Sequence, residues 1–244
     1  MKILVANDDG IDALGLKLLT EFASTLGEVV VCAPKYEQSG RSHGVVFDRP
    51  FEVLEVDDFK YIGVKAYRID AAPADCVRFA LDVIDSDFDF VFAGINRGLN
   101  IGDDISYSGT CAISFEAGFA GIPAISFSSK SKSIAESANY LKPVWDYLID
   151  KKAFEHASIF NVNIPKDPKG ILLTTQGRVY YKDKFIKTED EGMYKAEYCL
   201  ARSSETVFNP TVDIDAVLMG YCSVTPLCTK RTDFTAYEKL KFLA

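Results

Sequence analysis

The chain has 244 residues, 48% apolar and 25% charged, which is enough for one large α/β domain or for a core with an added segment. Its formal net charge of −8 argues against a long nucleic-acid partner, although a bound cation can reverse the local sign of an acidic pocket. No apolar stretch approaches the ~20 residues of a membrane span, and the apolar run at the N-terminus is too short for a signal peptide.

The cysteine and histidine content favours a reducing compartment and argues against zinc. No two of the six cysteines form a C-x-x-C pair, and most lie in apolar runs. We therefore expect reduced, mostly buried thiols in a cytoplasmic protein. The two histidines, His43 and His156, do not lie beside a cysteine pair, so a zinc site is not expected.

The first part of the chain reads as a strand, a helix and a second strand. Lys2 to Ala6 is a short apolar run that predicts a buried strand. Apolar residues then recur at helical spacing up to Gly27, at positions 16, 19, 22, 23 and 26. Val29 to Ala33 predicts the second strand. Strands that are apolar on both faces belong to a parallel sheet covered by helices.

The same alternation continues along the chain. It predicts helices over residues 74–84, 110–120 and 141–149, and strands over 88–93, 123–127, 158–164 and 171–175. Residues 177–210 mix aromatic and charged side chains, which favours β-structure and loops. The second half of the chain therefore reads as an elaboration of the first.

Three polar loops follow predicted core strands, so we expect them at the carboxyl edge of the sheet, where ligands bind. The first loop is Asn7-Asp8-Asp9-Gly10. Adjacent carboxylates repel each other, and oxygen ligands are what Mg²⁺ or Mn²⁺ prefers. A simple turn is the alternative, because Asp-Gly is a common turn dipeptide.

The other two loops carry neutral oxygen ligands. The loop after the second strand contains Ser39-Gly40, and the loop after residue 93 contains Asn96 among three glycines spaced four apart. Exposed polar or flexible loops are the alternatives, but a loop of about 15 residues within a compact domain is more often functional.

The third loop ends in Tyr107-Ser108-Gly109-Thr110, directly before a helix of small residues. A helix N-terminus offers free N–H groups and a favourable dipole to a phosphate. Ser and Thr are also ordinary N-cap residues, and the two interpretations are compatible.

Together these loops predict a metal-dependent phosphatase. Asp8, Asp9, Ser39 and Asn96 would hold one divalent cation that activates a water molecule. Asn7, Ser39, Asn96 and the N–H groups at Ser108, Gly109 and Thr110 would bind the phosphate. Asp8 and Asp9 are both candidates for the general base, with Asn96 as the third catalytic residue, and the sequence does not distinguish the two carboxylates.

The chain resembles the SurE (survival protein E) family of nucleotidases. The matching motifs are Asn7-Asp8-Asp9-Gly10-Ile11, Ala33-Pro34 with Gln38-Ser39-Gly40, Pro73-Ala74-Asp75-Cys76-Val77, Gly94-Ile95-Asn96 with Gly98 and Asn100, and Tyr107-Ser108-Gly109-Thr110. Weaker similarities lie at Asn161 to Pro165 and at Gly220 to Leu227. The resemblance therefore extends from residue 3 to about residue 227.

The resemblance implies a Rossmann-like three-layer α/β/α sandwich with a mostly parallel sheet and a β-rich C-terminal elaboration. It implies one domain, with a core over about 1–130 and an elaboration over about 131–244. It also implies metal ligands at the four residues above and hydrolysis of nucleoside 5′- and 3′-monophosphates with Mg²⁺ or Mn²⁺, with short polyphosphate as a further substrate. Members form homodimers or homotetramers by exchanging C-terminal segments, here from about residue 228.

Two positions depart from the family pattern. Ala71-Ala72 stands where the family usually has Gly-Thr, and a turn with φ > 0 would strain an alanine there. Arg41-Ser42-His43-Gly44 stands where the family tends to a Ser-rich run. We expect His43 to be a surface histidine, and a substrate contact is the alternative.

Two other functions fit parts of the pattern. A nucleotide-sensing module would keep the site for binding only, but a pure sensor has no need of adjacent carboxylates. A phosphatase with an aspartyl-phosphate intermediate also places an Asp after the first strand. Such enzymes use a D-x-D arrangement, whereas Asp8 and Asp9 are adjacent.

Overall fold

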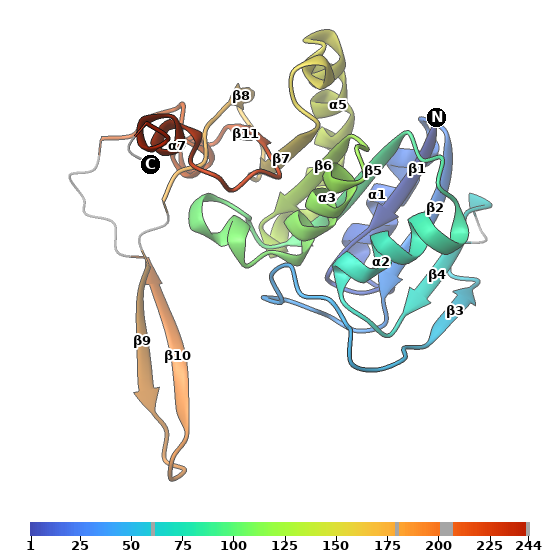
Figure 1. Cartoon of the computed structure of the whole chain (residues 1–244), viewed down its shortest axis with the longest axis horizontal. Helices are drawn as coiled ribbons and strands as arrows, with labels where there is room; N and C mark the ends of the chain where they lie inside the picture. Colours follow the sequence, from blue (N-terminus) through green and yellow to red (C-terminus); the bar gives the residue numbers. More distant parts are fainter. Residues whose placement is uncertain (60–61, 179–180, 201–206, 243–244) are drawn as a thin grey trace.

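The structure is a computed structural model, and it describes residues 1–59, 62–178, 181–200 and 207–242. A nine-stranded sheet runs through it in the order β3-β4-β2-β1-β5-β6-β7-β11-β8 (Figure 1). The strands are β1 Lys2–Ala6, β2 Glu28–Pro34, β3 Val53–Val56, β4 Lys65–Ile69, β5 Phe90–Arg97, β6 Ala124–Ser129, β7 Ile159–Ile164, β8 Ile171–Leu173 and β11 Cys222–Leu227.

Most of the sheet is parallel, as predicted. Six consecutive strands of the sheet, β4-β2-β1-β5-β6-β7, pair with one another in parallel. At the two ends of this group, β3 is antiparallel to β4, and β11 is antiparallel to β7. Helices cover both faces (Figure 1), which makes the three-layer α/β/α sandwich that the family pattern implies. The helices are α1 Leu14–Ser24, α2 Pro73–Phe79, α3 Gly109–Phe119, α4 Ile134–Ser137, α5 Leu141–Asp150, α6 Asp213–Leu218 and α7 Phe234–Leu240.

The side chains of strand β1 are buried on both faces of the sheet. Ile3 and Val5 point into a core shared with α1 and α5, whereas Leu4 and Ala6 point into a second core shared with α2 and α3. All four side chains are fully buried. A strand with no solvent face reads as a continuous apolar run, which is the pattern seen in the sequence.

The topology puts a switch point beside β1. The chain leaves β1 toward β2 on one side, and β5 pairs with β1 on the other side. In open α/β sheets, ligands bind outside the carboxyl ends of the strands at such a point. The loops after β1, β2 and β5 are the three loops predicted to form the site.

Several boundaries differ from the sequence prediction. The helix expected over 74–84 is α-helical only to Phe79 and continues as a π-helical turn over Ala80–Ile84. Strand β5 runs to Arg97, so Gly94 and Asn96 lie in a strand that was expected to end at residue 93. Strands β3, β4 and β11 and helices α6 and α7 were not predicted.

Beyond β8 the described chain forms a separate antiparallel hairpin of β9 Tyr181–Lys187 and β10 Tyr194–Leu200, which projects from the body in Figure 1. This agrees with the β-structure expected within residues 177–210, except that residues 179–180 and 201–206 lie outside the described residues. Nowhere in the described chain is a helix long and apolar enough to cross a membrane.

Candidate active site

Two buried carboxylates stand at the carboxyl end of β1. Asp8 is 4% exposed, and its Oδ1 accepts a hydrogen bond of 2.5 Å from the hydroxyl of Thr110. Asp9 Oδ2 accepts one of 2.9 Å from the backbone N–H of Arg97. Burial raises the pKa of Asp8 to about 6, and burial also raises the pKa of Asp9. Two adjacent ionised carboxylates are therefore destabilising here unless a cation joins them.

The turn that carries the two carboxylates is closed by Asn7 and joined to the next loop. Asn7 Nδ2 donates to the carbonyl of Gly10 at 2.9 Å, and Gly10 has φ +98°. Gln38 N donates to the carbonyl of Asp8 at 2.7 Å, which brings the loop after β2 against the loop after β1. Asn7 Oδ1 is buried without a hydrogen-bond partner, an acceptor of the kind that a bound ligand or water satisfies.

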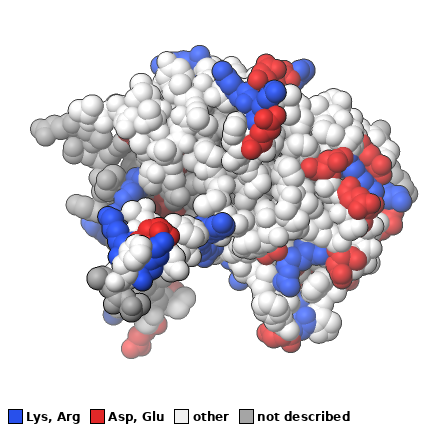
Figure 2. Space-filling view, turned by 45° about the horizontal axis from the view of Figure 1, so that its top comes forward, with Lys and Arg blue, Asp and Glu red and all other residues white. Residues whose placement is uncertain are grey.

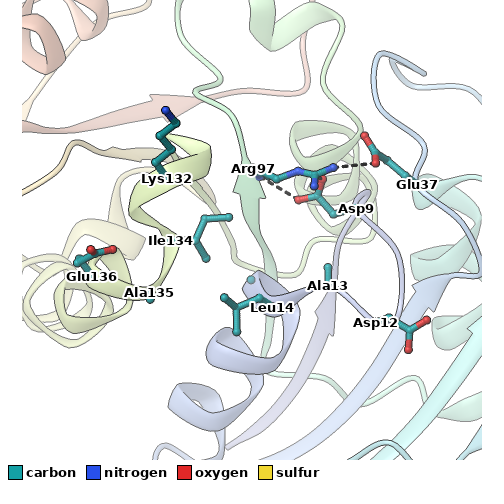
Figure 3. A pocket seen from close by; sticks show the side chains of 11 residues that line it. Asp9, Asp12, Ala13, Leu14, Glu37, Arg97, Lys132, Ile134, Ala135 and Glu136 are labelled. Atoms are coloured by element: carbon teal, nitrogen blue, oxygen red, sulfur yellow. Dashed lines mark hydrogen bonds and ion pairs between the residues drawn. The ribbon is translucent and has the colours of Figure 1, made fainter.

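Ser39 joins the site through Glu37. The Ser39 hydroxyl donates to Glu37 Oε1 at 2.7 Å, and Arg97 Nη2 donates to Glu37 Oε2 at 2.7 Å. Arg97 Nε lies 3.9 Å from Asp9 Oδ1, so its guanidinium bridges Glu37 and Asp9 (Figure 3). The hydroxyl of Ser39 and then the charge of Arg97 hold the pKa of Glu37 below its usual range.

Asn96 comes from the end of β5, which lies close to its neighbours. A Cβ on Gly94 would lie 2.3 Å from the carbonyl oxygen of Phe127, and a Cβ on Gly15 would lie 2.0 Å from that of Ile95. Both positions therefore require glycine for β5 to pack between β6 and α1. Asn96 Nδ2 donates to the carbonyl of Gly98 at 2.9 Å, and the amide oxygen is the side-chain atom that could serve as a ligand.

The start of α3 closes the site on the other side of Asp8. Ser108 is the N-cap, and its hydroxyl accepts from Cys111 N at 3.1 Å. A Cβ on Gly109 would lie 2.8 Å from Asp8 Cβ, so the first turn of the helix lies directly against this carboxylate. The N–H groups of a first helical turn have no carbonyl partner within the helix, and they carry the positive end of its dipole. Both the hydroxyl and the backbone N–H of Thr110 hydrogen-bond to Asp8.

A cavity of about 590 Å³ opens beside Asp9 (Figure 3). Its charged lining includes Asp12, Glu37 and Arg97, with Lys132 on the far wall. Leu14 and Ile134 provide apolar surface. Apart from Asp9, this lining was not predicted from the sequence. Glu37 lay in a loop already singled out, but nothing in the pattern marks Lys132, because its loop after β6 contains no motif.

The donor set fits a hard divalent cation. It offers two carboxylates, one hydroxyl and one amide oxygen, all oxygen ligands of the kind that Mg²⁺ and Mn²⁺ prefer. In the described part of the chain, no three or more His, Cys, Asp or Glu side chains gather in a group that could hold a metal. A cation between Asp8 and Asp9 would therefore need further oxygen ligands, and Ser39 and Asn96 are the ones that the sequence predicts.

The two departures from the family pattern have clear structural outcomes. Ala72 has φ −76°, and Ala71 is not among the residues with positive φ, so the turn does not strain an alanine. His43 is a half-buried histidine at the surface with side-chain partners. Its side chain is 18% exposed, its Nε2 lies 2.7 Å from Glu116 Oε1, and its ring stacks on Phe119 at 5.6 Å.

Comparison with known proteins places the chain in a family. The family model for survival protein SurE matches residues 3–183. The 5′-nucleotidase SurE of Thermoanaerobacter sp. (strain X514) is 35% identical over 250 residues, covering 100% of this chain and 97% of the relative. The 5′-nucleotidase SurE of Vibrio cholerae serotype O1 (strain ATCC 39315) is 32% identical, covering 99% and 95%.

A solved structure agrees with both sequence comparisons. The crystal structure of the SurE protein from Aquifex aeolicus matches with a TM-score of 0.82 at 33% sequence identity, covering 100% of this chain and 99% of that one. The similarity is therefore present at full length in both sequence and fold. The chain belongs to the SurE family.

Proposed function

We propose that this chain is a divalent-metal-dependent phosphatase that hydrolyses nucleoside 5′- and 3′-monophosphates to nucleoside and phosphate. The 5′-nucleotidase activity follows from the full-length similarity to relatives named 5′-nucleotidase SurE. Metal dependence and 3′ activity are the parts that we add. The observation that supports them best is the Asp8–Asp9 pair: Asp8 is buried against the first turn of α3, and the side chain of Asp9 is 7% exposed.

Each residue of the site has a role in this proposal. Asp8, Asp9, Ser39 and Asn96 hold one Mg²⁺ or Mn²⁺ per subunit, which when bound supplies Lewis-acid activation of water and phosphate. The N–H groups around Ser108 to Thr110 bind the phosphate oxygens where charge develops. Asn7 shapes the turn and offers its unpartnered Oδ1. Asp9, which borders the cavity, is the better placed of the two carboxylates to accept a proton from water.

The cavity favours substrates with a single phosphate. Asp9, Asp12, Glu37 and Glu136 line it against two cationic side chains, Arg97 and Lys132, so its charge balance is negative. A neutral nucleoside enters such a cavity more readily than a second phosphate does. We therefore propose that short polyphosphate is a side substrate, hydrolysed more slowly than monophosphates.

The test is phosphate release from a panel of nucleoside 5′- and 3′-monophosphates with Mg²⁺, with Mn²⁺ and without metal. Asp9→Asn should reduce kcat by about 10³-fold or more, because losing one preorganised charged group costs on that scale. Asp82→Asn, an exposed aspartate on the π-helical turn, is the matched control. Full turnover after exhaustive dialysis against EDTA would contradict metal dependence. Tight nucleotide binding without turnover in the presence of any metal would mean that the chain is a nucleotide sensor and not an enzyme.

We also propose that the chain is a single domain in a cytoplasmic homodimer or homotetramer that exchanges residues from about 228 onward. One sheet joins strands from both halves of the chain, which supports a single domain. The described cysteine side chains are free, with Cys228 exposed, which suits a reducing compartment. Helix α7 has no buried residue, so another surface is needed to cover it.

The charge distribution supports small substrates rather than nucleic acid. On the face shown in Figure 2, the charged side chains form several separate groups, and basic and acidic side chains are mixed within them. No continuous basic stripe crosses the described residues of that face. Nucleic-acid surfaces gather Lys and Arg along such a stripe.

A further inference from the structure

Glu37 is the one side chain that contacts both Ser39 and Arg97 in the described structure. Its Oε1 accepts from the Ser39 hydroxyl at 2.7 Å and its Oε2 from Arg97 Nη2 at 2.7 Å. Arg97 in turn donates its backbone N–H to Asp9 at 2.9 Å. Glu37 therefore connects the loop after β2 to the end of β5 and, through it, to the carboxylate after β1.

The hydrogen bond from Ser39 has a consequence for metal binding. A serine hydroxyl has one proton and two lone pairs. A cation accepts only a lone pair, so the proton has to point away from it. Glu37 Oε1 receives that proton, so the lone pairs of Ser39 stay available to a further partner such as a cation. In metal sites, such outer partners fix the orientation of the ligand and raise its basicity.

We propose that Glu37 is a positioning residue of the metal site, which orients the Ser39 hydroxyl as a neutral ligand by accepting its proton. The inference rests on the proposed function, because Ser39 is a ligand only if the site binds a cation. Glu37 is not itself a metal ligand in this proposal and acts on the cation through Ser39. Arg97 limits the motion of Glu37 by holding its second carboxylate oxygen.

The competing explanation is general electrostatics, since any carboxylate near the site attracts a cation. Glu136 provides the matched comparison, because it lines the same cavity, whereas the Ser39 hydroxyl donates to Glu37. Glu37 and Ser39 are both exposed, so replacing either one leaves the core intact. Circular dichroism and a thermal midpoint within a few degrees of the wild type check this for each variant.

The experiment measures the Kd for Mn²⁺ by calorimetry and by the electron paramagnetic resonance signal of free Mn²⁺, in the full chain without substrate. Glu37→Ala should weaken Mn²⁺ binding about 10–100-fold, the usual range for loss of an outer-sphere partner. Ser39→Ala should weaken it by a comparable factor. The double variant should bind no more weakly than Ser39→Ala alone, because Glu37 acts through that hydroxyl.

Two further variants separate hydrogen bonding from charge. Glu37→Gln keeps an amide oxygen that accepts from Ser39, so its Kd should stay within about threefold of the wild type. Glu136→Ala should also leave the Kd within about threefold. Factors for Glu37→Ala and Ser39→Ala that multiply in the double variant would overturn the inference, as would an equal loss in Glu136→Ala. A wild type that binds no Mn²⁺ would reject the proposed metal site as well, and only that outcome rejects both.

Discussion

Asp8 is a carboxylate that the fold removes from water. It is 4% exposed, and its one described side-chain partner is the neutral hydroxyl of Thr110. Burial raises its pKa from 3.8 to about 6. Between these two pH values the folded chain holds more protons than the unfolded chain, so the free energy of unfolding of the metal-free protein falls as pH rises. Above about pH 6 the loss is complete and amounts to about 3 kcal/mol.

Asp8→Asn should therefore stabilise the metal-free protein near neutral pH while it abolishes activity. Asparagine keeps the shape and accepts the bond from Thr110 without a charge. Thermal unfolding in EDTA should show a midpoint roughly 5 °C or more above the wild type at pH 7.5, and no difference at pH 4. Adding Mn²⁺ should raise the midpoint of the wild type alone. A lower midpoint for Asp8→Asn at both pH values would show that the carboxylate is not a source of strain.

For single residues, the sequence nominates oxygen-bearing side chains near the ends of predicted strands, and it does not nominate side chains whose role depends on distant contacts. Asp8, Ser39 and Asn96 could be nominated because each follows a predicted strand and carries an oxygen ligand. Glu37 could not, because its importance comes from reaching Arg97 across the site, 60 residues away in the chain. Such a pairing has no local signal in one sequence.

At the scale of elements, the buried strands were predictable and the half-exposed ones were not. Strands β1 and β2 are apolar on both faces and read clearly as strands. Strand β3 lies at the edge of the sheet with Leu54 exposed, so it carries no continuous apolar run. The end of β5 was missed because Gly94 reads as a loop residue, whereas the structure uses it to admit the carbonyl of Phe127.

The contact between the start of α3 and Asp8 predicts the effect of a substitution in this helix. In Gly109→Ala the new Cβ would lie 2.8 Å from Asp8 Cβ and 2.9 Å from its Oδ2, so the carboxylate or the helix start has to move. A shift of about 1 Å at a reacting centre can cost 10²-fold in rate. We expect kcat for a nucleoside monophosphate to fall at least tenfold, although alanine favours the helix by about 1 kcal/mol.

The same helix provides the control. In Gly118→Ala the new Cβ would lie 2.6 Å from Ile159 Cδ1, a contact at the opposite end of α3. This variant should lose thermal stability and keep its kcat. If both variants lost activity in proportion to their loss of stability, displacement of Asp8 would not be the cause.

At the scale of the whole molecule, the C-terminal part has apolar surface that this single chain does not bury. Helix α7 exposes Phe234, Tyr237 and Leu240, each more than half exposed, at a spacing of three residues. The hairpin of β9 and β10 exposes Phe185 and Tyr194 in the same way. Apolar side chains on a projecting hairpin and on a helix without buried residues mark an interaction surface, which is the reason to expect exchange between subunits.

Replacing these three side chains of α7 by serine should therefore separate the subunits without unfolding them, since none belongs to the core. Light scattering after size exclusion should give the wild type two or four times the 27.0 kDa of one chain, and the triple variant 27.0 kDa at micromolar concentration. Val83→Ser, at a residue 62% exposed on the π-helical turn, is the control and should keep the assembly. Equal masses for the wild type and the triple variant would place the interface elsewhere, because serine cannot maintain contacts that depend on burying three large apolar side chains.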